Sequence, residues 1–445
     1  MKEEIKIRIE AVRRGEVPEG YKRENGYIIP AEWNTAELKN MFTRSTKKNH
    51  IGCDNVLTIS AQMGLISQRD FYEKDIASED KSEYYLMRNG DFAYNKSYSA
   101  GYDYGAIKRL DKYTEGIVSP LYICMTPQSE TNSDFYVQYF EAGRYNREIY
   151  RFAQEGARNH GLLNIAVEDF FNGVVVVPSE TEQQKIAEIL ATCDKVIELK
   201  QKLIEELQRL KKLFMKKMFP QKGKVVPEIR FPGFTEAWEQ RKFSDVFSFL
   251  QNNTLSRTEL SEESGAAKNV HYGDVLMKFG EYLDVSKEQF TFIQAETVAE
   301  KFKSSFLQNG DIIIADTAED ETVGKCCEIA NSAGIKLVSG LHTMPCRPNQ
   351  KYASGYLGYY MNSPAYHDQL LPLMQGTKVT SVSKTAISGT VLTYPASEAE
   401  QSQISQCLLS IDNLITLHQR ELEEEQRKKK ALMQLLLTGL VRVKT

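Results

Sequence analysis

The pattern of hydrophobic and polar positions along this chain has two periods, which predict two kinds of element. The run FAYNKS (92–97) alternates polar and apolar residues, and the run DIIIAD (311–316) is rich in β-branched residues. NG and GD turn dipeptides mark the turns before them, so both runs predict strands. Residues 132–153 and 352–374 carry aromatic side chains at helical spacing. We therefore expect helices there, with the aromatic faces buried in a core.

Two much longer helices are predicted, and they begin with the same sequence device. The first begins SETEQQKIAEILATCDKVIELKQ (179–201) and the second SEAEQSQISQCLLSIDNLITLHQ (397–419), each after a short apolar run that ends at proline. Apolar residues recur every three or four positions for about 40 residues, a length of about 60 Å. Ser179 with Glu182, and Ser397 with Glu400, match the S-x-x-E capping box. We expect each hydroxyl to accept a backbone N–H of the first turn and each glutamate to reach back to the cap.

The apolar stripe of each long helix predicts a contact with an equally long partner, and the other long helix is the obvious one. The predicted contact residues are Ile186, Leu190, Ile197, Leu203 and Leu207 in the first helix and Ile404, Leu408, Ile411, Ile415 and Leu422 in the second. Asp194 and Asp412 occupy the same register of the two segments, as do Gln201 and Gln419. This favours an internal duplication over two unrelated amphipathic helices.

The repeat extends beyond the helices. IPAEWNTAELKNMF (29–42) and FTEAWEQRKFSDVF (234–247) both place tryptophan nine residues before phenylalanine, and we expect Trp33 and Trp238 to be core anchors. Gly156 and Gly376 are separated by nearly the same number of positions as the two long helices. Each glycine either closes a turn at positive φ or lets the backbone approach a ligand closely. We therefore predict two units, each a strand-rich region followed by a long helix. Their bounds are 1–178 and 179–222, then 223–396 and 397–445.

Length and composition narrow the class of protein. A chain of 445 residues is too long for one ordinary core, in agreement with two or more domains. No apolar run approaches the roughly 20 residues of a membrane helix and the N-terminus lacks a secretory signal, so we expect a cytoplasmic protein with no membrane segment. Seven cysteines without a CxxC pair argue against a zinc site or a disulfide framework. Cys326 and Cys327 are predicted to be free, partly buried thiols rather than a redox pair.

No catalytic constellation is recognisable in the sequence. It lacks a GxxxxGK[ST] phosphate loop, and its six histidines form no HExxH or zinc-type cluster, which favours a binding protein. One enzymatic alternative is a nuclease that binds a divalent cation through the acidic run DTAEDET (316–322), although a solvated loop is the favoured explanation of that run. Another alternative is a coiled-coil interaction protein whose globular regions bind other proteins and do not bind DNA. The net charge of −4 means that any DNA contact must use local basic patches or a partner.

Several segments resemble the specificity subunits of type I restriction-modification systems. The central run PSETEQQKIAEILATCDKVIELKQKLIEELQRLKKLFMKKMFP and the following PEIRFPGFTEAWEQRK resemble the family's central conserved region. LTISAQMGLI (57–66), NGDFAYNKSYSAGYDYGAIKRL (89–110), GIVSPLYI (116–123), NVHYGDVLMKFGEYLD (269–284) and LLLTGLVRV (435–443) occur in the family's order. The resemblance covers nearly the whole chain.

The resemblance implies an α+β fold with two target recognition domains, each reading one half of a split DNA site. Each domain is followed by a long conserved helix, and the two helices pair as an antiparallel coiled coil with a pseudo-twofold internal repeat. In this family the helices dock two methyltransferase subunits, which carry S-adenosylmethionine, and restriction subunits add ATP-driven and magnesium-dependent steps. This chain itself would hold no cofactor and catalyse nothing.

Loops rich in polar and basic side chains are the expected readers of base edges, because only such groups match the donors and acceptors of the DNA grooves. The DNA-binding candidates are Lys47, Lys48, Asn49, Lys96, Tyr98, Arg158, Asn159 and His160 in the first unit and Asn252, Asn253, Arg257, His271, Lys378, Thr380 and Lys384 in the second. For each basic residue the sequence leaves three interpretations open: base contact, phosphate contact, or neither.

Overall fold

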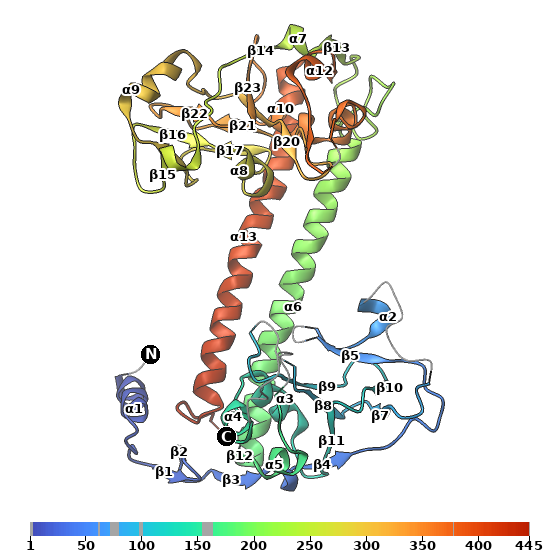
Figure 1. Cartoon of the computed structure of the whole chain (residues 1–445), viewed down its shortest axis with the longest axis vertical. Coiled ribbons are helices and arrows are strands. Elements are labelled where there is room, and N and C mark those ends of the chain that lie inside the picture. The colour runs from blue at the N-terminus through green and yellow to red at the C-terminus, as the bar shows by residue number, and fades with distance from the viewer. Residues whose placement is uncertain are drawn as a thin grey trace. The chain divides into compact units, whose positions relative to one another are not determined.

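The computed structural model describes residues 3–60, 63–71, 80–97, 101–153, 163–376 and 378–444, without the side chains of residues 71 and 257. The chain divides into two compact units, unit 1 (Met1–Leu199 and Leu422–Thr445) and unit 2 (Lys200–Glu421). The two predicted long helices are present as α6 (Glu180–Lys217, 38 residues) and α13 (Glu398–Leu436, 39 residues), green and red in Figure 1. Each of these helices contributes one part to unit 1 and the other part to unit 2.

Unit 1 is built on a four-stranded antiparallel sheet. Its strand order is β4 (Phe42–Ser45), β11 (Ile123–Pro127), β8 (Phe92–Asn95) and β9 (Ala106–Arg109). Four two-stranded pairs surround it: β1 (Tyr21–Glu24) with β2 (Tyr27–Pro30), β3 (Asn34–Glu37) with β12 (Val174–Val177), β5 (Leu57–Ser60) with β6 (Gly64–Ser67), and β7 (Tyr85–Arg88) with β10 (Glu115–Val118). Its helices are α1 (Glu3–Arg13), η1 (Leu38–Asn40), α2 (Gln68–Phe71), α3 (Ser133–Glu141), α4 (Asn146–Phe152) and α5 (Val167–Asn172).

Unit 2 contains two larger sheets. One has the order β14 (Phe247–Phe249), β23 (Thr343–Pro348), β19 (Ile312–Ala315), β21 (Cys326–Ala330), β17 (Tyr282–Asp284), and the other β15 (Leu260–Ser261), β18 (Thr291–Ile293), β16 (Ala267–Val270), β22 (Leu337–Ser339). Two pairs complete it, β13 (Glu239–Lys242) with β25 (Val391–Tyr394) and β20 (Thr317–Ala318) with β24 (Thr380–Ser381). The shorter helices are α7 (Phe243–Val246), η2 (Arg257–Glu259), α8 (Tyr272–Met277), α9 (Glu296–Ala299), η3 (Glu300–Ser305), α10 (Tyr356–Asn362), α11 (Pro364–His367), η4 (Leu371–Leu373) and α12 (Lys384–Ser388).

The aromatic segments are helical as predicted, but each is broken. In 132–153 the helix ends before Gly143, which takes the left-handed φ of 64° that favours glycine, and α4 begins after it. In 352–374 the extended Ser363 and the following Pro364 separate α10 from α11. Phe135, Tyr136, Tyr139, Tyr356 and Tyr360 are all buried, so the prediction that the aromatic faces lie in the cores is confirmed.

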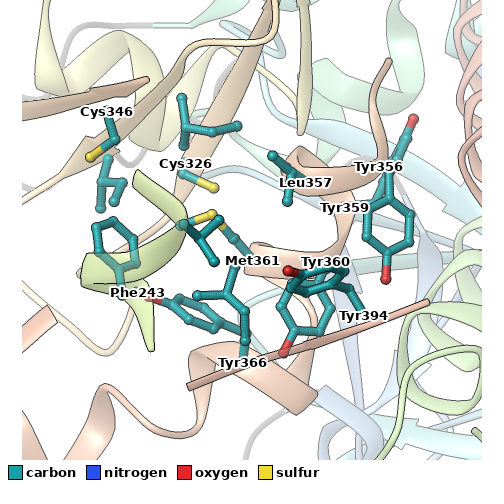
Figure 2. Packing of buried hydrophobic residues seen from close by; sticks show 14 of the residues in the cluster. Phe243, Cys326, Cys346, Tyr356, Leu357, Tyr359, Tyr360, Met361, Tyr366 and Tyr394 are labelled. Carbon is teal, nitrogen blue, oxygen red and sulfur yellow. The ribbon is translucent and has the colours of Figure 1, made fainter. Parts of the chain in front are cut away.

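The core of unit 2 also encloses thiols. Tyr356 and Tyr360 stack with their ring planes 3° apart, and the sulfur atoms of Cys326 and Cys346 lie among the side chains of this core (Figure 2). Cys326 and Cys327 are free, as predicted, but they are fully rather than partly buried. Burial raises the pKa of Cys327 to about 12 and keeps that thiol protonated.

The predicted strands lie at the centres of the two main sheets, in β8 and β19. Every residue of β19 is buried, which explains its continuous β-branched run. Within the parts of the chain that the structure describes, no helix combines the length and apolar character needed to cross a membrane.

Candidate nucleic-acid interface

The start of α6 in unit 1 is built around the carboxylate of Glu182. Trp33 Nε1 donates to Glu182 Oε2 at 2.7 Å, and Arg442 donates from Nε at 2.6 Å and from Nη2 at 2.9 Å. Burial alone would raise the pKa of Glu182, but the hydrogen bonds from Arg442 and Trp33 outweigh it and leave that pKa below its usual range. The predicted cap hydroxyl is present, since Glu182 N donates to Ser179 Oγ at 3.4 Å. The glutamate reaches back to the cap residue, since Ser179 Oγ donates to Glu182 Oε2 at 3.2 Å, but its carboxylate also binds an indole and a guanidinium, which the sequence did not predict.

The start of α13 in unit 2 has the same construction with different chain segments. Trp238 Nε1 donates to Glu400 Oε1 at 3.2 Å, and Arg230 donates from Nε at 2.7 Å and from Nη2 at 2.9 Å. The cap hydroxyl is again present, with Glu400 N donating to Ser397 Oγ at 3.4 Å. Trp238 is buried, as is Trp33 in unit 1, so the prediction that both tryptophans are core anchors is confirmed.

A second contact ties each globular region to both long helices. In unit 1, Asp194 of α6 accepts from Gln138 of α3 at 2.8 Å and forms an ion pair with Lys429 of α13. In unit 2, Asp412 of α13 accepts from Tyr359 of α10 at 2.7 Å and pairs with Lys211 of α6 at 2.8 Å. Lys211 also binds Glu281 at 2.7 Å.

Most of the predicted helix contact residues are buried. Ile186 and Leu190 lie in the core of unit 1, Ile404 and Leu408 lie in the core of unit 2, and Ile411 and Ile415 are also buried. Ile197, Leu207 and Leu422 are half-buried.

The prediction that Leu203 is a helix contact residue is wrong. Leu203 is 42% exposed, and its neighbour Ile204 is buried instead. Ile204 lies one heptad after Ile197, whereas Leu203 is turned away from that stripe by one residue, about 100° around the helix.

The carboxyl ends of four strands of unit 2 meet at one edge. β16 and β22 are parallel, and β14 and β19 both run antiparallel to β23 and therefore in the same direction as each other. Hydrogen bonds join the loops that follow: Asn253 N to Ser339 O at 2.8 Å, Gly340 N to Val270 O at 2.8 Å, and Asp316 N to His342 O at 3.2 Å. We call this surface the unit 2 loop edge. It comprises residues 250–257, 271–272, 316–322, 340–342 and 378–384.

The predicted asparagines and histidine of unit 2 all lie at this edge, but they hold loops together. Asn253 is 1% exposed, and its amide donates to Asn269 Oδ1 at 2.7 Å and to Ser339 O at 2.9 Å. Burial removes Asn253 from the residues that can reach a base. Asn252, half-buried, donates to Gly340 O at 3.2 Å. His271 caps α8, because its Nδ1 accepts from Gly273 N at 3.1 Å.

The remaining candidates of unit 2 are more accessible. Lys378 is exposed, and the exposed Lys384 has its Nζ 5.3 Å from the centre of the Phe249 ring. Thr380 donates to Asp320 O at 3.0 Å. Gly376 has a φ of 115°, and a Cβ there would lie 2.0 Å from Val379 O, so the interpretation as a turn residue is confirmed. The side chain of Arg257 is outside the described atoms.

Unit 1 has a matching but smaller edge, because β4 and β8 both run antiparallel to β11 and end on the same side. Lys47, after β4, is exposed, and Lys96, after β8, is half-buried. Lys48 is bound to Glu83 Oε2 at 2.8 Å, and Asn49 is buried with its amide donating to Cys53 O at 2.9 Å. Asn49 is therefore a structural residue. The candidates outside the described residues are Tyr98, Arg158, Asn159 and His160, together with Gly156.

The acidic run 316–322 forms a self-bonded turn. Asp320 Oδ1 accepts from Thr322 N at 2.9 Å and from Thr322 Oγ1 at 2.5 Å. These bonds, the hydroxyl first, lower the pKa of Asp320. Among the described residues, no group of three or more histidine, cysteine, aspartate or glutamate side chains is arranged to hold a metal ion.

Sequence reasoning missed His342 of the unit 2 loop edge, which lies beside Tyr272. Their rings lie 5.4 Å apart in an edge-on arrangement, and His342 Nδ1 lies 3.4 Å from Asp316 Oδ1. The only signal in the sequence is the aligned pair KLVSGLHTMPC and GIVSPLYICM, in which His342 stands where the first unit has Tyr122.

Comparison with known proteins gives relatives over most of the chain. The type I restriction enzyme MjaVIII specificity subunit of Methanocaldococcus jannaschii is 25% identical over 339 residues, covering 74% of this chain and 75% of that protein. The putative type I restriction enzyme MjaX specificity subunit of the same organism is 24% identical over 447 residues, covering 96% of this chain and 98% of that protein. No family model matches the chain.

Solved structures share the fold. A chain from a structure of complex assembly and conformational transition in a type I restriction-modification system matches with a TM-score of 0.55 at 14% identity, covering 93% of this chain and all of that chain. The type I restriction-modification S subunit of M. genitalium matches with a TM-score of 0.52 at 14% identity, covering 95% of this chain and 99% of that chain. The mixed α+β fold is therefore shared with these structures.

Proposed function

This chain is a homologue of the specificity subunits of type I restriction enzymes, and from that relationship we propose that it is the DNA sequence-recognition subunit of such a complex. It is a non-catalytic subunit, since its relatives are named as specificity subunits of restriction enzymes. Each unit reads one half of a bipartite site. The observation that carries this proposal is that two separate compact units each present a loop edge at the carboxyl ends of their strands.

The long helices form the proposed scaffold. Asp194 of α6 pairs with Lys429 of α13, while Lys211 of α6 pairs with Asp412 of α13. As the residue number rises along α6, its partner's number falls along α13, which supports an antiparallel pair. Asp194 and Asp412 are 218 positions apart, as are Lys211 and Lys429, which supports a pseudo-twofold internal duplication.

This scaffold sets the distance between the half-sites. Two major grooves that face the same side of DNA lie roughly 34–36 Å apart. An α-helix of 38 residues spans about 57 Å, so a rigid pair of such helices is long enough to hold two readers over both grooves.

The proposed partners are double-stranded DNA, two methyltransferase subunits and restriction subunits. The helix part of unit 2 exposes Leu203, Leu210, Leu213, Leu414 and Leu417. Apolar side chains in a row on a helix are typical of a protein–protein contact, and we assign them to methyltransferase docking. The complex would act in the cytoplasm, and S-adenosylmethionine, ATP and magnesium would be bound by the partners.

The DNA contacts would come from the accessible candidates. Lys47 and Lys96 serve unit 1, and Asn252, His271, Lys378, Thr380 and Lys384 serve unit 2. Because the net charge is −4, the chain alone lacks the electrostatic attraction of a basic DNA-binding protein, and affinity should rise when methyltransferase subunits are added.

Single-molecule methylome sequencing tests the proposal. The chain is expressed with its methyltransferase subunit in a host that lacks adenine methylation, and the methyltransferase alone is the control. The expected result is a split motif, two defined ends around an unspecified spacer, modified on both strands only when both chains are present. Modification of every adenine alike contradicts the proposal. Magnesium-dependent cleavage by the isolated chain would instead support the nuclease alternative.

A further inference from the structure

His342 of unit 2 holds a backbone conformation that glycine adopts most easily. It has a φ of 56°, in the left-handed region, and the other non-glycine residues with positive φ among those described are Asn25 and Asn331. Asparagine visits this region through local hydrogen bonds of its short side chain, whereas a histidine must be held there by its surroundings. Asp316 N provides one such contact by donating to His342 O at 3.2 Å. Residues held in such conformations cluster at binding sites.

The imidazole is oriented by three neighbours. Its Nδ1 lies 3.4 Å from Asp316 Oδ1 and 3.5 Å from Thr317 Oγ1, and the Tyr272 ring stands edge-on at 5.4 Å. The side chain is 48% exposed. The ring thus turns its Nδ1 edge toward the protein and stays half-accessible.

Several loops support this position. Asn252 donates to Gly340 O, two residues before His342, at 3.2 Å. Thr317 pairs with Ser381 between β20 and β24, which brings the exposed Lys378 and Lys384 segment to the same edge. Basic side chains beside a polar reader are the arrangement expected for phosphate contacts that position a base contact.

From this geometry we propose that His342 is a base-reading residue whose Nε2 accepts a hydrogen bond from the exocyclic amine of adenine or cytosine in the major groove. The proposal rests on the proposed function and assigns a residue and a ligand class within it. The Asp316 carboxylate, 3.4 Å from Nδ1, favours a proton on that nitrogen, and in the neutral ring this leaves the Nε2 lone pair as an acceptor. In the major groove only adenine N6 and cytosine N4 offer amine donors.

Unit 1 would read DNA with different chemistry at the corresponding position. Tyr122 stands there, between β10 and β11, and packs against the cluster formed by Leu57, Leu65, Met87 and their neighbours. A half-buried tyrosine cannot replace an imidazole acceptor, so the two halves of the site should differ at the base that His342 reads.

The deciding variant is His342→Gly. Glycine adopts the native φ without strain, so folding is preserved while the imidazole is lost. Purified complex of the chain with its methyltransferase is tested on the wild-type motif and on duplexes with one base changed, together with methylome sequencing. One position in one half of the motif should relax from adenine or cytosine to any base, with discrimination lower by roughly tenfold and the other half unchanged. Asn331→Gly, a second left-handed residue of unit 2, is the matched control and should leave the motif intact.

Two results would overturn the proposal. Unchanged discrimination at every position would mean that His342 reads no base. Equal weakening on every duplex would make it a phosphate-contacting or structural residue. Failure of the proposed function is distinguishable, because the wild-type complex would then yield no split motif.

Asp316→Asn tests the tautomer directly. When the amide of the new side chain donates to Nδ1, the ring proton moves to Nε2, which becomes a donor. The preferred base should then change to one that presents an acceptor in the major groove: guanine, thymine, or adenine through N7. Cytosine offers only a donor there, so a cytosine preference should be lost and an adenine preference should broaden to guanine. An unchanged pattern of base preference in this variant would contradict the assigned acceptor role.

Discussion

The starts of α6 and α13 share the same contacts, a glutamate carboxylate bound by a tryptophan and an arginine, but differ in the surroundings of the arginine. In unit 1, Arg442 binds both Glu182 and Glu32, and its side chain is 34% exposed. In unit 2, Arg230 is 13% exposed, and beyond Glu400 it donates to the backbone carbonyl of Glu236. Glu182 therefore shares its cation with a second carboxylate, whereas Glu400 is the single carboxylate bonded to Arg230 among the described residues. The two copies of a repeated sequence motif can therefore contribute different amounts to the stability of their units.

The loop edges differ more than the helix starts. Unit 1 has a four-stranded main sheet, whereas unit 2 adds β17 to the corresponding sheet and builds a second four-stranded sheet beside it. The parts that are repeated bind the long helices, and the parts that differ carry the proposed DNA contacts. This division is what two readers of different sequences on one scaffold require.

The largest expected effect is that of Glu400→Ala. Removal of this carboxylate leaves the buried Trp238 indole without an acceptor and leaves Arg230 with only the backbone carbonyl of Glu236, so unit 2 should lose about 3–5 kcal/mol of unfolding free energy. Glu182→Ala should lower the unfolding free energy of unit 1 by less, about 1–3 kcal/mol. Arg442 keeps its ion pair with Glu32 and is more exposed to solvent than Arg230. The chain has two tryptophans, one in each unit, so fluorine NMR of 5-fluorotryptophan protein in urea follows each unit separately. Equal losses in the two units would contradict the comparison.

The pH dependence of the two units should differ in sign. Burial raises the pKa of Glu328 in unit 2 to about 7, although the N–H groups of Gly358 and Gly355 bind its carboxylate. The folded unit therefore holds a proton that the unfolded chain releases, and its stability should fall by roughly 3 kcal/mol as pH rises from about 4.5 to about 7. Glu182 in unit 1 has a lowered pKa, so its contribution is present at neutral pH and is lost as pH falls below its ordinary range.

Glu328→Gln isolates this effect. Glutamine cannot accept at both oxygens, so unit 2 becomes less stable overall, but its stability should no longer fall between these pH values. Urea titrations of the Trp238 signal at several pH values measure this slope. A slope that survives in Glu328→Gln would assign it to another group.

A smaller difference is expected for the helix lysines. Lys211→Met removes the cation shared by Asp412 and Glu281 and should destabilise unit 2 by about 2 kcal/mol. Lys429→Met leaves Asp194 half-exposed and still bonded to Gln138, so unit 1 should lose about 1 kcal/mol. The same fluorine signals report both values, and a larger loss for Lys429→Met would reverse the ranking.

The smallest effect on stability is expected for the exposed leucines. Leu203→Ser should change unfolding free energy by less than about 0.5 kcal/mol, because the side chain is not in the core. If these leucines dock the methyltransferase, the same change should weaken co-purification of that subunit. Leu207→Ser, at a half-buried neighbouring position, is the control for general helix damage. Unaltered assembly of Leu203→Ser would remove this surface from the proposal.

Local signals in the sequence predicted much of the fold. Helix starts at Ser179 and Ser397, the helical character of the two aromatic segments and the burial of Trp33 and Trp238 depend on residues a few positions apart, and all of these predictions are confirmed. The breaks within the two aromatic segments were not predicted. The partners of Glu182 and Glu400 were not predictable. Arg442 lies 260 positions from Glu182 and Arg230 lies 170 positions from Glu400, whereas a capping box offered each carboxylate a local donor that explained the same spacing.

The candidate DNA contacts were harder to predict for a related reason. Polar loop residues such as Asn49 and Asn253 satisfy buried backbone groups as readily as they bind bases, and only burial separates the two roles. His342 was missed because no composition signal marks a left-handed histidine. Its importance depends on Asp316 and Tyr272, which are distant in the sequence.

The central claim is that two units read separate half-sites at a distance set by the paired helices. It is tested most directly by inserting seven residues after Glu205 in α6 and seven after Leu417 in α13, opposite positions in the proposed antiparallel register. Seven residues preserve the heptad and lengthen each helix by about 10.5 Å, or roughly three base pairs. Methylome sequencing of the assembled variant should find both defined ends of the motif unchanged and the spacer longer by about three base pairs. Modification with the original spacer would contradict the claim.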